Sequence, residues 1–144
     1  MKVLVLGSGA REHALATTLA RDPIVEKVYA APGSAMMSQV AELVRVDLRS
    51  PSQAAALAKE LEVGLVVVGP EAPLVAGVAD AVREVGIPCF GPSKGAAQIE
   101  GSKAFAKEVM AAAGVPTAQS RVCADIAEVE AALDESGAPY VVKE

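Results

Sequence analysis

Short apolar runs alternate with longer segments of helical composition along most of the chain. Residues 3–6 and 65–68 are continuous apolar runs that each end at a glycine, which is typical of strands buried on both faces of a sheet. Shorter strands are predicted at residues 25–30, 43–46 and 87–90. The pattern therefore indicates five short strands, none of them alternating strictly between apolar and polar residues.

Helices are predicted between these strands, at residues 11–21, 51–62 and 75–85. Ser50 suits the N-cap of the second helix and Pro51 its first position. Strands that alternate with helices through short links favour an α/β fold. We expect an open, mostly parallel sheet with helices on both faces.

The character of the chain changes after about residue 93. From there the pattern predicts three helices and two strands: helices at 93–99, 102–113 and 126–133, and strands at 117–122 and 140–143. The last of these strands would be unfinished at Glu144. We therefore expect a truncated chain, with one domain and the beginning of a second.

Composition narrows the class of protein. With 144 residues, of which 52% are hydrophobic, the chain can bury a core, and its formal net charge of −5 disfavours a nucleic-acid surface or a polybasic membrane patch. Cys89 and Cys123 have no CxxC spacing, so we expect reduced thiols in a cytoplasmic protein. No apolar run approaches the ~18 residues of a membrane span.

The first candidate site is the turn after the first strand, where the sequence reads Gly7, Ser8, Gly9, Ala10, Arg11, Glu12 and His13. Glycines allow a sharp turn and close approach to the amides, and the start of a helix favours an anion such as a phosphate. The dinucleotide fingerprint needs a small residue where Glu12 stands, and an acid where the second strand ends at Ala30. Both departures count against NAD.

Three polar side chains follow this turn, and each has two interpretations. Arg11 could pair with a phosphate, and Glu12 could accept hydrogen bonds from sugar hydroxyls or an amine; alternatively they form a solvated first helical turn, with Glu12 complementing the helix dipole. His13 is the only histidine, and a structural role is favoured over catalysis.

Further candidates follow later strands. Glu71, between two prolines after the strand at 65–68, suits hydroxyls or an ammonium group, or else it caps the next helix. Lys103 and Lys143 are candidate contacts to a polyphosphate, although each taken alone is a typical surface charge.

Four stretches taken together resemble the phosphoribosylamine–glycine ligases, also called glycinamide ribonucleotide synthetases. They are GSGAREHALA at 7–16, APGS at 31–34, VVVGPEAPLVAGVAD at 66–80 and FGPSKGAAQIEGSKAFAKEVM at 90–110. The resemblance extends through the whole chain. One departure is Ser34, where the family usually has asparagine.

The resemblance implies a Rossmann-like, substrate-binding domain at residues 1–100 and the beginning of an ATP-grasp domain at 101–144. It implies an ATP-dependent ligase of purine biosynthesis that joins glycine to 5-phosphoribosylamine, with Mg²⁺ or Mn²⁺, by way of a glycyl phosphate. The chain alone is expected to be inactive without the remainder of the ligase. We expect small-molecule substrates, and neither a nucleic acid nor a membrane as partner.

For site residues, the resemblance implies that the loop Gly7–His13 and Glu71 hold phosphoribosylamine, and that Lys103 and Lys143 contact ATP. It implies no nucleophilic side chain and no metal ligand within this chain. Three alternatives stay open: a dinucleotide-binding oxidoreductase domain, a non-catalytic phosphosugar-binding or assembly module, and a related ATP-grasp ligase of purine synthesis.

Overall fold

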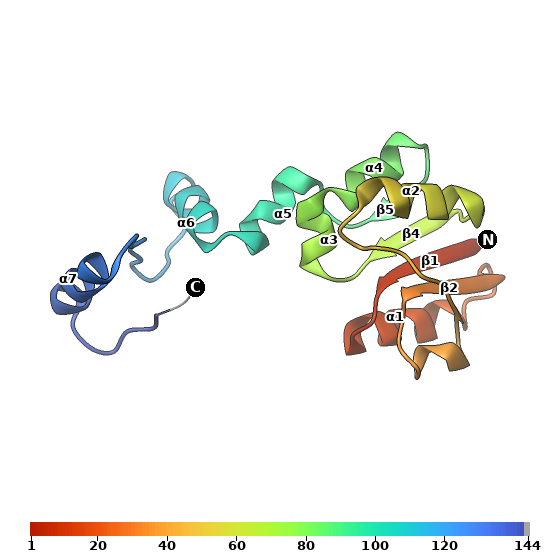
Figure 1. Cartoon of the computed structure of the whole chain (residues 1–144), viewed down its shortest axis with the longest axis horizontal. Coiled ribbons are helices and arrows are strands. Elements are labelled where there is room, and N and C mark those ends of the chain that lie inside the picture. Colours follow the sequence, from red (N-terminus) through yellow and green to blue (C-terminus); the bar gives the residue numbers. More distant parts are fainter. Residues whose placement is uncertain (143–144) are drawn as a thin grey trace. The chain divides into compact units, whose positions relative to one another are not determined.

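The predicted strands assemble into one parallel sheet in the computed structural model, which describes residues 1–142 (Figure 1). The order across the sheet is β3-β2-β1-β4-β5. The strands are β1 (Lys2–Gly7), β2 (Lys27–Pro32), β3 (Glu42–Leu43), β4 (Leu65–Val68) and β5 (Cys89–Phe90). All five predicted strands are present and the α/β class is confirmed, although β3 and β5 are shorter than the predicted ranges 43–46 and 87–90.

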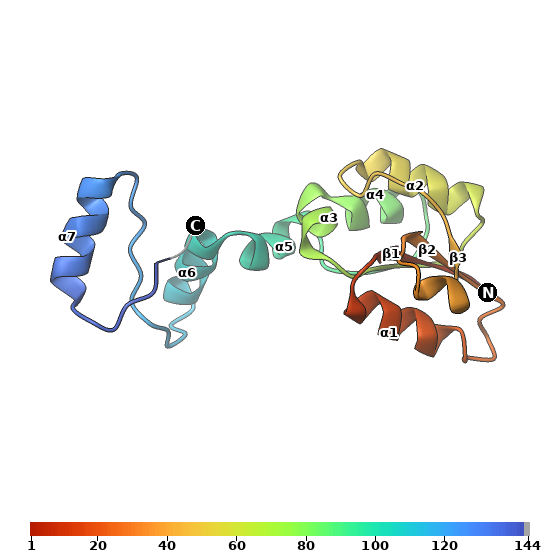
Figure 2. The ribbon, with the colours of Figure 1, turned by 60° about the horizontal axis from the view of Figure 1, so that its bottom comes forward.

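Helices cover both faces of this sheet. Figure 2 shows α1 on one face and α2, α3 and α4 on the other. The helical elements are α1 (Ala10–Leu19), the short η1 (Met37–Gln39), α2 (Pro51–Glu60), α3 (Glu71–Ala76), α4 (Val78–Glu84) and α5 (Lys94–Gly101). β2 and β3 lie on one side of β1, and β4 and β5 lie on the other. The sheet is therefore built outward in two opposite directions, and this reversal of winding falls between the neighbouring strands β1 and β4.

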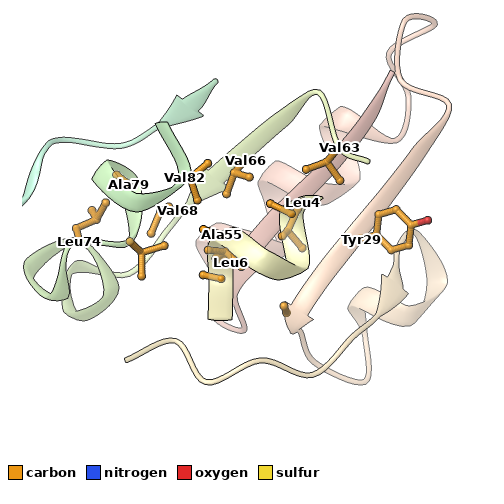
Figure 3. Packing of buried hydrophobic residues seen from close by; sticks show 14 of the residues in the cluster. Leu4, Leu6, Tyr29, Ala55, Val63, Val66, Val68, Leu74, Ala79 and Val82 are labelled. Carbon is orange, nitrogen blue, oxygen red and sulfur yellow. The ribbon is translucent and has the colours of Figure 1, made fainter. Parts of the chain in front are cut away.

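The core consists of two layers that share the central strand. Leu4 and Leu6 of β1 point into the cluster under α2 and α4, whose members include Val66 and Val82 (Figure 3). Val3 and Val5 of β1 belong to the cluster on the opposite face, beneath α1. A strand buried on both faces has no polar alternation, which is why β1 is a continuous apolar run.

The helix predicted at 75–85 corresponds to α4, and a further helix, α3, precedes it from Glu71. Gly77 separates α3 from α4, with a backbone φ of +103° that glycine adopts readily and other residues rarely do. Composition alone favoured one helix, because both pieces are rich in alanine and valine. α3 begins at Glu71, soon after β4 ends at Val68.

The chain divides into two units, Met1–Ser102 and Lys103–Glu144. The second contains α6 (Lys103–Ala112) and α7 (Ile126–Ser136), as the helical pattern predicted. The strand prediction at 117–122 is wrong, and residues 140–142 form no strand either; Lys143 lies outside the described residues. Isolated strands are marginal without a partner, and neither segment pairs with another strand within residues 1–142.

No helix in the described part of the chain is long and apolar enough to cross a membrane.

Candidate functional site

Three loops meet where β1, β2 and β4 end. Gly7 pairs with Pro32 across the sheet, and the amide of Gly33 donates a 3.2 Å hydrogen bond to the Gly7 carbonyl. The amide of Gly69, directly after β4, donates a 3.1 Å hydrogen bond to the Leu6 carbonyl. The sequence motifs around residues 7–13, 31–34 and 69–71 are thus brought to one edge of the sheet.

The turn from β1 into α1 has the backbone that its glycines predict. Gly7 has a φ of +129°, and Gly9 is the N-cap of α1. Ser8 and Ala10 are exposed on either side of Gly9. The chain therefore passes from strand to helix within two residues, which leaves no room for a longer loop over the sheet edge.

Glu12 lies inside this turn and not on its surface. The residue is 4% exposed, and it is the only charged residue that is buried among residues 1–142. Its Oε2 accepts a 2.8 Å hydrogen bond from the Gly9 amide, and its Oε1 accepts a 3.1 Å hydrogen bond from Nε of Arg11. The alternative interpretation, a solvated first helical turn, is therefore wrong for Glu12.

The carboxylate occupies space that three glycines leave open. An ideal Cβ would come within 2.5 Å of Glu12 at Gly7, 2.9 Å at Gly9 and 2.1 Å at Gly69. The sequence predicted an anion against unpaired amides at this turn, but the Gly9 amide donates its hydrogen bond to the Glu12 carboxylate. Of the amides expected to receive an anion, that of Gly9 is therefore occupied, and the buried carboxylate of Glu12 places a negative charge within the turn.

Arg11 directly precedes Glu12 in the sequence, and its side chain is 61% exposed. Besides the Glu12 contact, its Nη2 donates a 2.5 Å hydrogen bond to the Gly69 carbonyl. The guanidinium therefore bridges the turn after β1 and the end of β4. Arginine offers five N–H donors in a planar fork, so two such contacts leave further donors for a ligand.

A cavity of about 570 Å³ opens beside Arg11, beyond the ends of β4 and β5. Its apolar walls include Leu15, Leu74 and Phe90, and the carboxylate-bearing Glu100 also lines it. The volume lies within the range of small-molecule sites, which are mainly apolar with a few polar groups. A guanidinium, a carboxylate and apolar walls suit a small ligand that carries an anionic group.

Cys89 is part of the wall of this cavity. Burial raises the pKa of the Cys89 thiol, an effect that the nearby guanidinium of Arg83 partly opposes. The thiol therefore stays neutral at physiological pH and behaves as a small apolar group. The prediction that this cysteine is a reduced thiol agrees with its free state.

The remaining predicted site residues lie apart from the contacts that Glu12 and Arg11 make. His13 is half-buried on α1, and Glu71 is exposed at the start of α3; neither side chain has a recorded hydrogen bond or ion pair within residues 1–142. Lys103 is exposed at the start of α6, in the second unit. Lys143 lies outside the described residues.

Sequence reasoning missed how closely the two glycine-containing loops interlock. The contact of Gly69 with Glu12 and the bond from Arg11 to Gly69 join residues far apart in the chain. It also missed Leu15, Cys89 and Phe90 as cavity walls. A usable signal existed, because a glycine at the end of each of two adjacent strands indicates close approach by another group.

An open parallel sheet with a cavity beyond the carboxyl ends of its strands, beside the reversal of winding between β1 and β4, defines a Rossmann-like α/β fold. Comparison with known families is more specific. Residues 1–100 match the model of the phosphoribosylglycinamide synthetase N domain, and the chain belongs to that family.

Curated relatives extend the match to all or nearly all of the chain. A phosphoribosylamine–glycine ligase of Streptomyces coelicolor is 65% identical over 144 residues, covering 100% of this chain and 35% of its own length. One from Mycobacterium leprae is 56% identical over 149 aligned residues, with the same coverage of 100% and 35%. The chain thus spans about a third of the length of these relatives.

Solved structures share the fold. A phosphoribosylamine–glycine ligase from Thermotoga maritima superposes with a TM-score of 0.61 at 25% identity, over 83% of this chain and 26% of that one. A phosphoribosylglycinamide synthetase from Anaerococcus prevotii gives 0.67 at 22% identity, over 96% and 35% of the two chains. The latter likeness concerns the fold alone.

Proposed function

We propose that this chain is the amino-terminal part of a phosphoribosylamine–glycine ligase, an ATP-dependent enzyme of purine biosynthesis. The complete enzyme joins glycine to 5-phosphoribosylamine and gives glycinamide ribonucleotide, ADP and phosphate. The observation that carries the proposal is the 65% identity to the Streptomyces coelicolor ligase over all 144 residues. The large share of each relative that lies beyond this match would supply the rest of the enzyme.

In this proposal the first unit binds phosphoribosylamine at the edge where β1 and β4 end. The guanidinium of Arg11 pairs with the 5-phosphate, because arginine offers charge-assisted, paired donors to phosphate oxygens. The exposed Ser8 and Ala10 lie beside it in the turn, and Glu71 reaches sugar hydroxyls or the amine. The cavity beside Arg11 supports this arrangement with a volume of about 570 Å³.

The second unit would begin the ATP-grasp domain, with residues 101–144 as its first segment. Lys103 and Lys143 would contact the phosphates of ATP. Mg²⁺ or Mn²⁺ would neutralise phosphate charge during acyl phosphate formation. Within residues 1–142 no group of three or more His, Cys, Asp or Glu side chains could hold a metal ion.

We further propose a cytoplasmic location, which the free thiols Cys89 and Cys123 favour. Among the alternatives, a dinucleotide-binding oxidoreductase domain is disfavoured by Glu12. Its buried carboxylate takes the Gly9 amide and the space that a pyrophosphate needs at this turn.

A chimaeric enzyme tests the proposal. Residues 1–144 of this chain replace the matching segment of the Streptomyces coelicolor ligase, and turnover is measured with ATP, glycine and phosphoribosylamine. We expect ligase activity from the chimaera and none from the 144-residue chain alone. A folded chimaera without activity contradicts the proposal, and turnover by the chain alone contradicts the assignment of ATP binding to a larger enzyme.

Binding by the chain itself is a second, simpler test. Ribose 5-phosphate, a stable relative of phosphoribosylamine, is titrated calorimetrically, with ribose and NADH as controls. We expect heat with ribose 5-phosphate only. Binding of NADH in place of the sugar phosphate would favour the oxidoreductase alternative.

A further inference from the structure

We propose that Glu12 is a positioning residue, which fixes the guanidinium of Arg11 at the mouth of the cavity in the orientation that receives a phosphate. The inference rests on the proposed function, since it concerns how the same site binds a phosphosugar. It assigns Glu12 contacts within the protein, where sequence reasoning expected a direct contact to the sugar.

The first argument is the burial of the carboxylate. A buried carboxylate is costly unless its oxygens have donors. Both Glu12 oxygens have one, from the Gly9 amide at 2.8 Å and from Nε of Arg11 at 3.1 Å. Loss of either donor leaves one oxygen of a buried carboxylate without a partner, so the three groups form one unit.

The second argument is the shape of the space around the side chain. Gly7, Gly9 and Gly69 come from three different places in the turn and the sheet, and a Cβ at any of them would approach Glu12 to less than 3.0 Å. The glycines of this site therefore fit a carboxylate from the protein itself. They do not leave the open cradle that a bound pyrophosphate requires.

The third argument is the geometry of Arg11. Nε is held by Glu12 and Nη2 by the Gly69 carbonyl, so the plane of the guanidinium is defined by two contacts on one side. An exposed arginine otherwise loses side-chain entropy when it binds a ligand. A guanidinium already oriented in the free protein loses less, and its affinity for a phosphate is correspondingly higher.

The charge of Glu12 also directs where the anion lies. A negative charge beneath the Gly9 amide disfavours a phosphate on the axis of α1, and Arg11 offers positive charge to the side, along the wall of the cavity. Glu12 therefore selects a single anionic group beside Arg11 over a pyrophosphate laid across the turn.

Calorimetric titration of the 144-residue chain with ribose 5-phosphate separates positioning from simple charge. Glu12→Gln removes a negative charge, which by itself should tighten phosphate binding. A glutamine carries an NH2 donor in place of one of the two oxygens, so either the Gly9 amide or Nε of Arg11 would face a donor and lose its acceptor. We expect weaker binding, by about tenfold, as for the loss of one charged hydrogen bond.

Two matched variants complete this test. Glu100→Gln removes a carboxylate from the wall of the same cavity, and we expect equal or tighter binding. Arg11→Gln should weaken binding at least as much as Glu12→Gln, and the double variant should be no weaker than Arg11→Gln alone. Wild-type affinity in Glu12→Gln, with weak binding in Arg11→Gln, overturns the positioning role and leaves the proposed function intact.

A ligand-free measurement reports the contact itself. In ¹⁵N-resolved NMR spectra, an arginine Nε–H held in a partly buried hydrogen bond to a carboxylate exchanges more slowly with water than that of an unpaired arginine. We expect one such signal, which is absent in Arg11→Lys and lost in folded Glu12→Gln. Its persistence in Glu12→Gln overturns the inference. Failure of the wild-type chain to bind ribose 5-phosphate contradicts the proposed function and, with it, the phosphate-binding role of Arg11.

Discussion

The carboxylate of Glu12 occupies the place that a side chain at Gly69 would need: an ideal Cβ at Gly69 lies 2.1 Å from Oε1 of Glu12. One residue opens α1 and the other follows β4, so the contact joins the two elements on either side of the reversal of winding. The absence of a side chain at Gly69 therefore leaves the space that the Glu12 carboxylate fills.

Gly69→Ala should destabilise the first unit, by about 1–3 kcal/mol, because the added methyl group displaces Glu12 from its two donors. Chemical denaturation of the variant measures this. Gly95→Ala is the control, since a Cβ at Gly95 has no neighbour within 4 Å. In Glu12→Ala the obstacle is gone, so the cost of adding Gly69→Ala should fall by at least about 0.5 kcal/mol. Additive costs would show that the two residues do not compete for space.

The sheet could be predicted from the sequence, whereas the environment of Glu12 could not. The runs at 3–6 and 65–68 report burial on both faces, which is a local property of each strand. Whether Glu12 is solvated or buried depends on Gly69, which is distant in the chain and adjacent only after β1 and β4 pair. A single sequence contains no record of that proximity.

The same distinction explains the errors elsewhere. Gly77 was overlooked because a lone glycine is tolerated inside a helix, and only its φ of +103° separates α3 from α4. The strand at 117–122 was predicted from local composition. A strand also needs a partner, and composition says nothing about where one is.

The core of the first unit should depend strongly on β1. Leu4→Ala removes a fully buried side chain between the sheet and α2, and we expect a loss of about 2–5 kcal/mol in the free energy of unfolding. Ile24→Ala is the control, because Ile24 is 68% exposed and should change stability by no more than about 0.5 kcal/mol. Denaturant titration of both variants checks the difference, and equal effects would contradict the assignment of this core.

Cys89 should react slowly in the folded chain. Burial raises the pKa of its thiol, so less of the reactive thiolate is present at pH 8 than in an unfolded chain. In a Cys123→Ser background, labelling by a thiol reagent should accelerate markedly in urea. The native state also holds this proton more tightly, so stability should fall as the pH rises past the ordinary thiol pKa of about 8.5. Labelling at the same rate with and without urea would contradict the burial of Cys89.

Arg83 should stabilise the segment at and after β5, which forms part of the cavity wall. Its Nη2 donates a 2.9 Å hydrogen bond to the Cys89 carbonyl and another hydrogen bond to the Gly91 carbonyl, which fixes the segment after β5. The two N–H bonds of Nη2 lie in fixed directions in the guanidinium plane, while Nη1 pairs with Asp80; a lysine ammonium has no such plane and cannot keep all three contacts in this geometry. Arg83→Lys should therefore cost about 1 kcal/mol of stability and raise amide hydrogen exchange in residues 89–93.

The matched control is Arg45→Lys, because Arg45 is exposed and makes no recorded hydrogen bond or ion pair through its side chain within residues 1–142. Hydrogen exchange read out by mass spectrometry should change around β5 in Arg83→Lys and remain as in the wild type in Arg45→Lys. Because the same segment forms part of the cavity, affinity for ribose 5-phosphate should fall in Arg83→Lys alone. Faster exchange around β5 with unchanged affinity would mean that the ligand does not use this wall of the cavity.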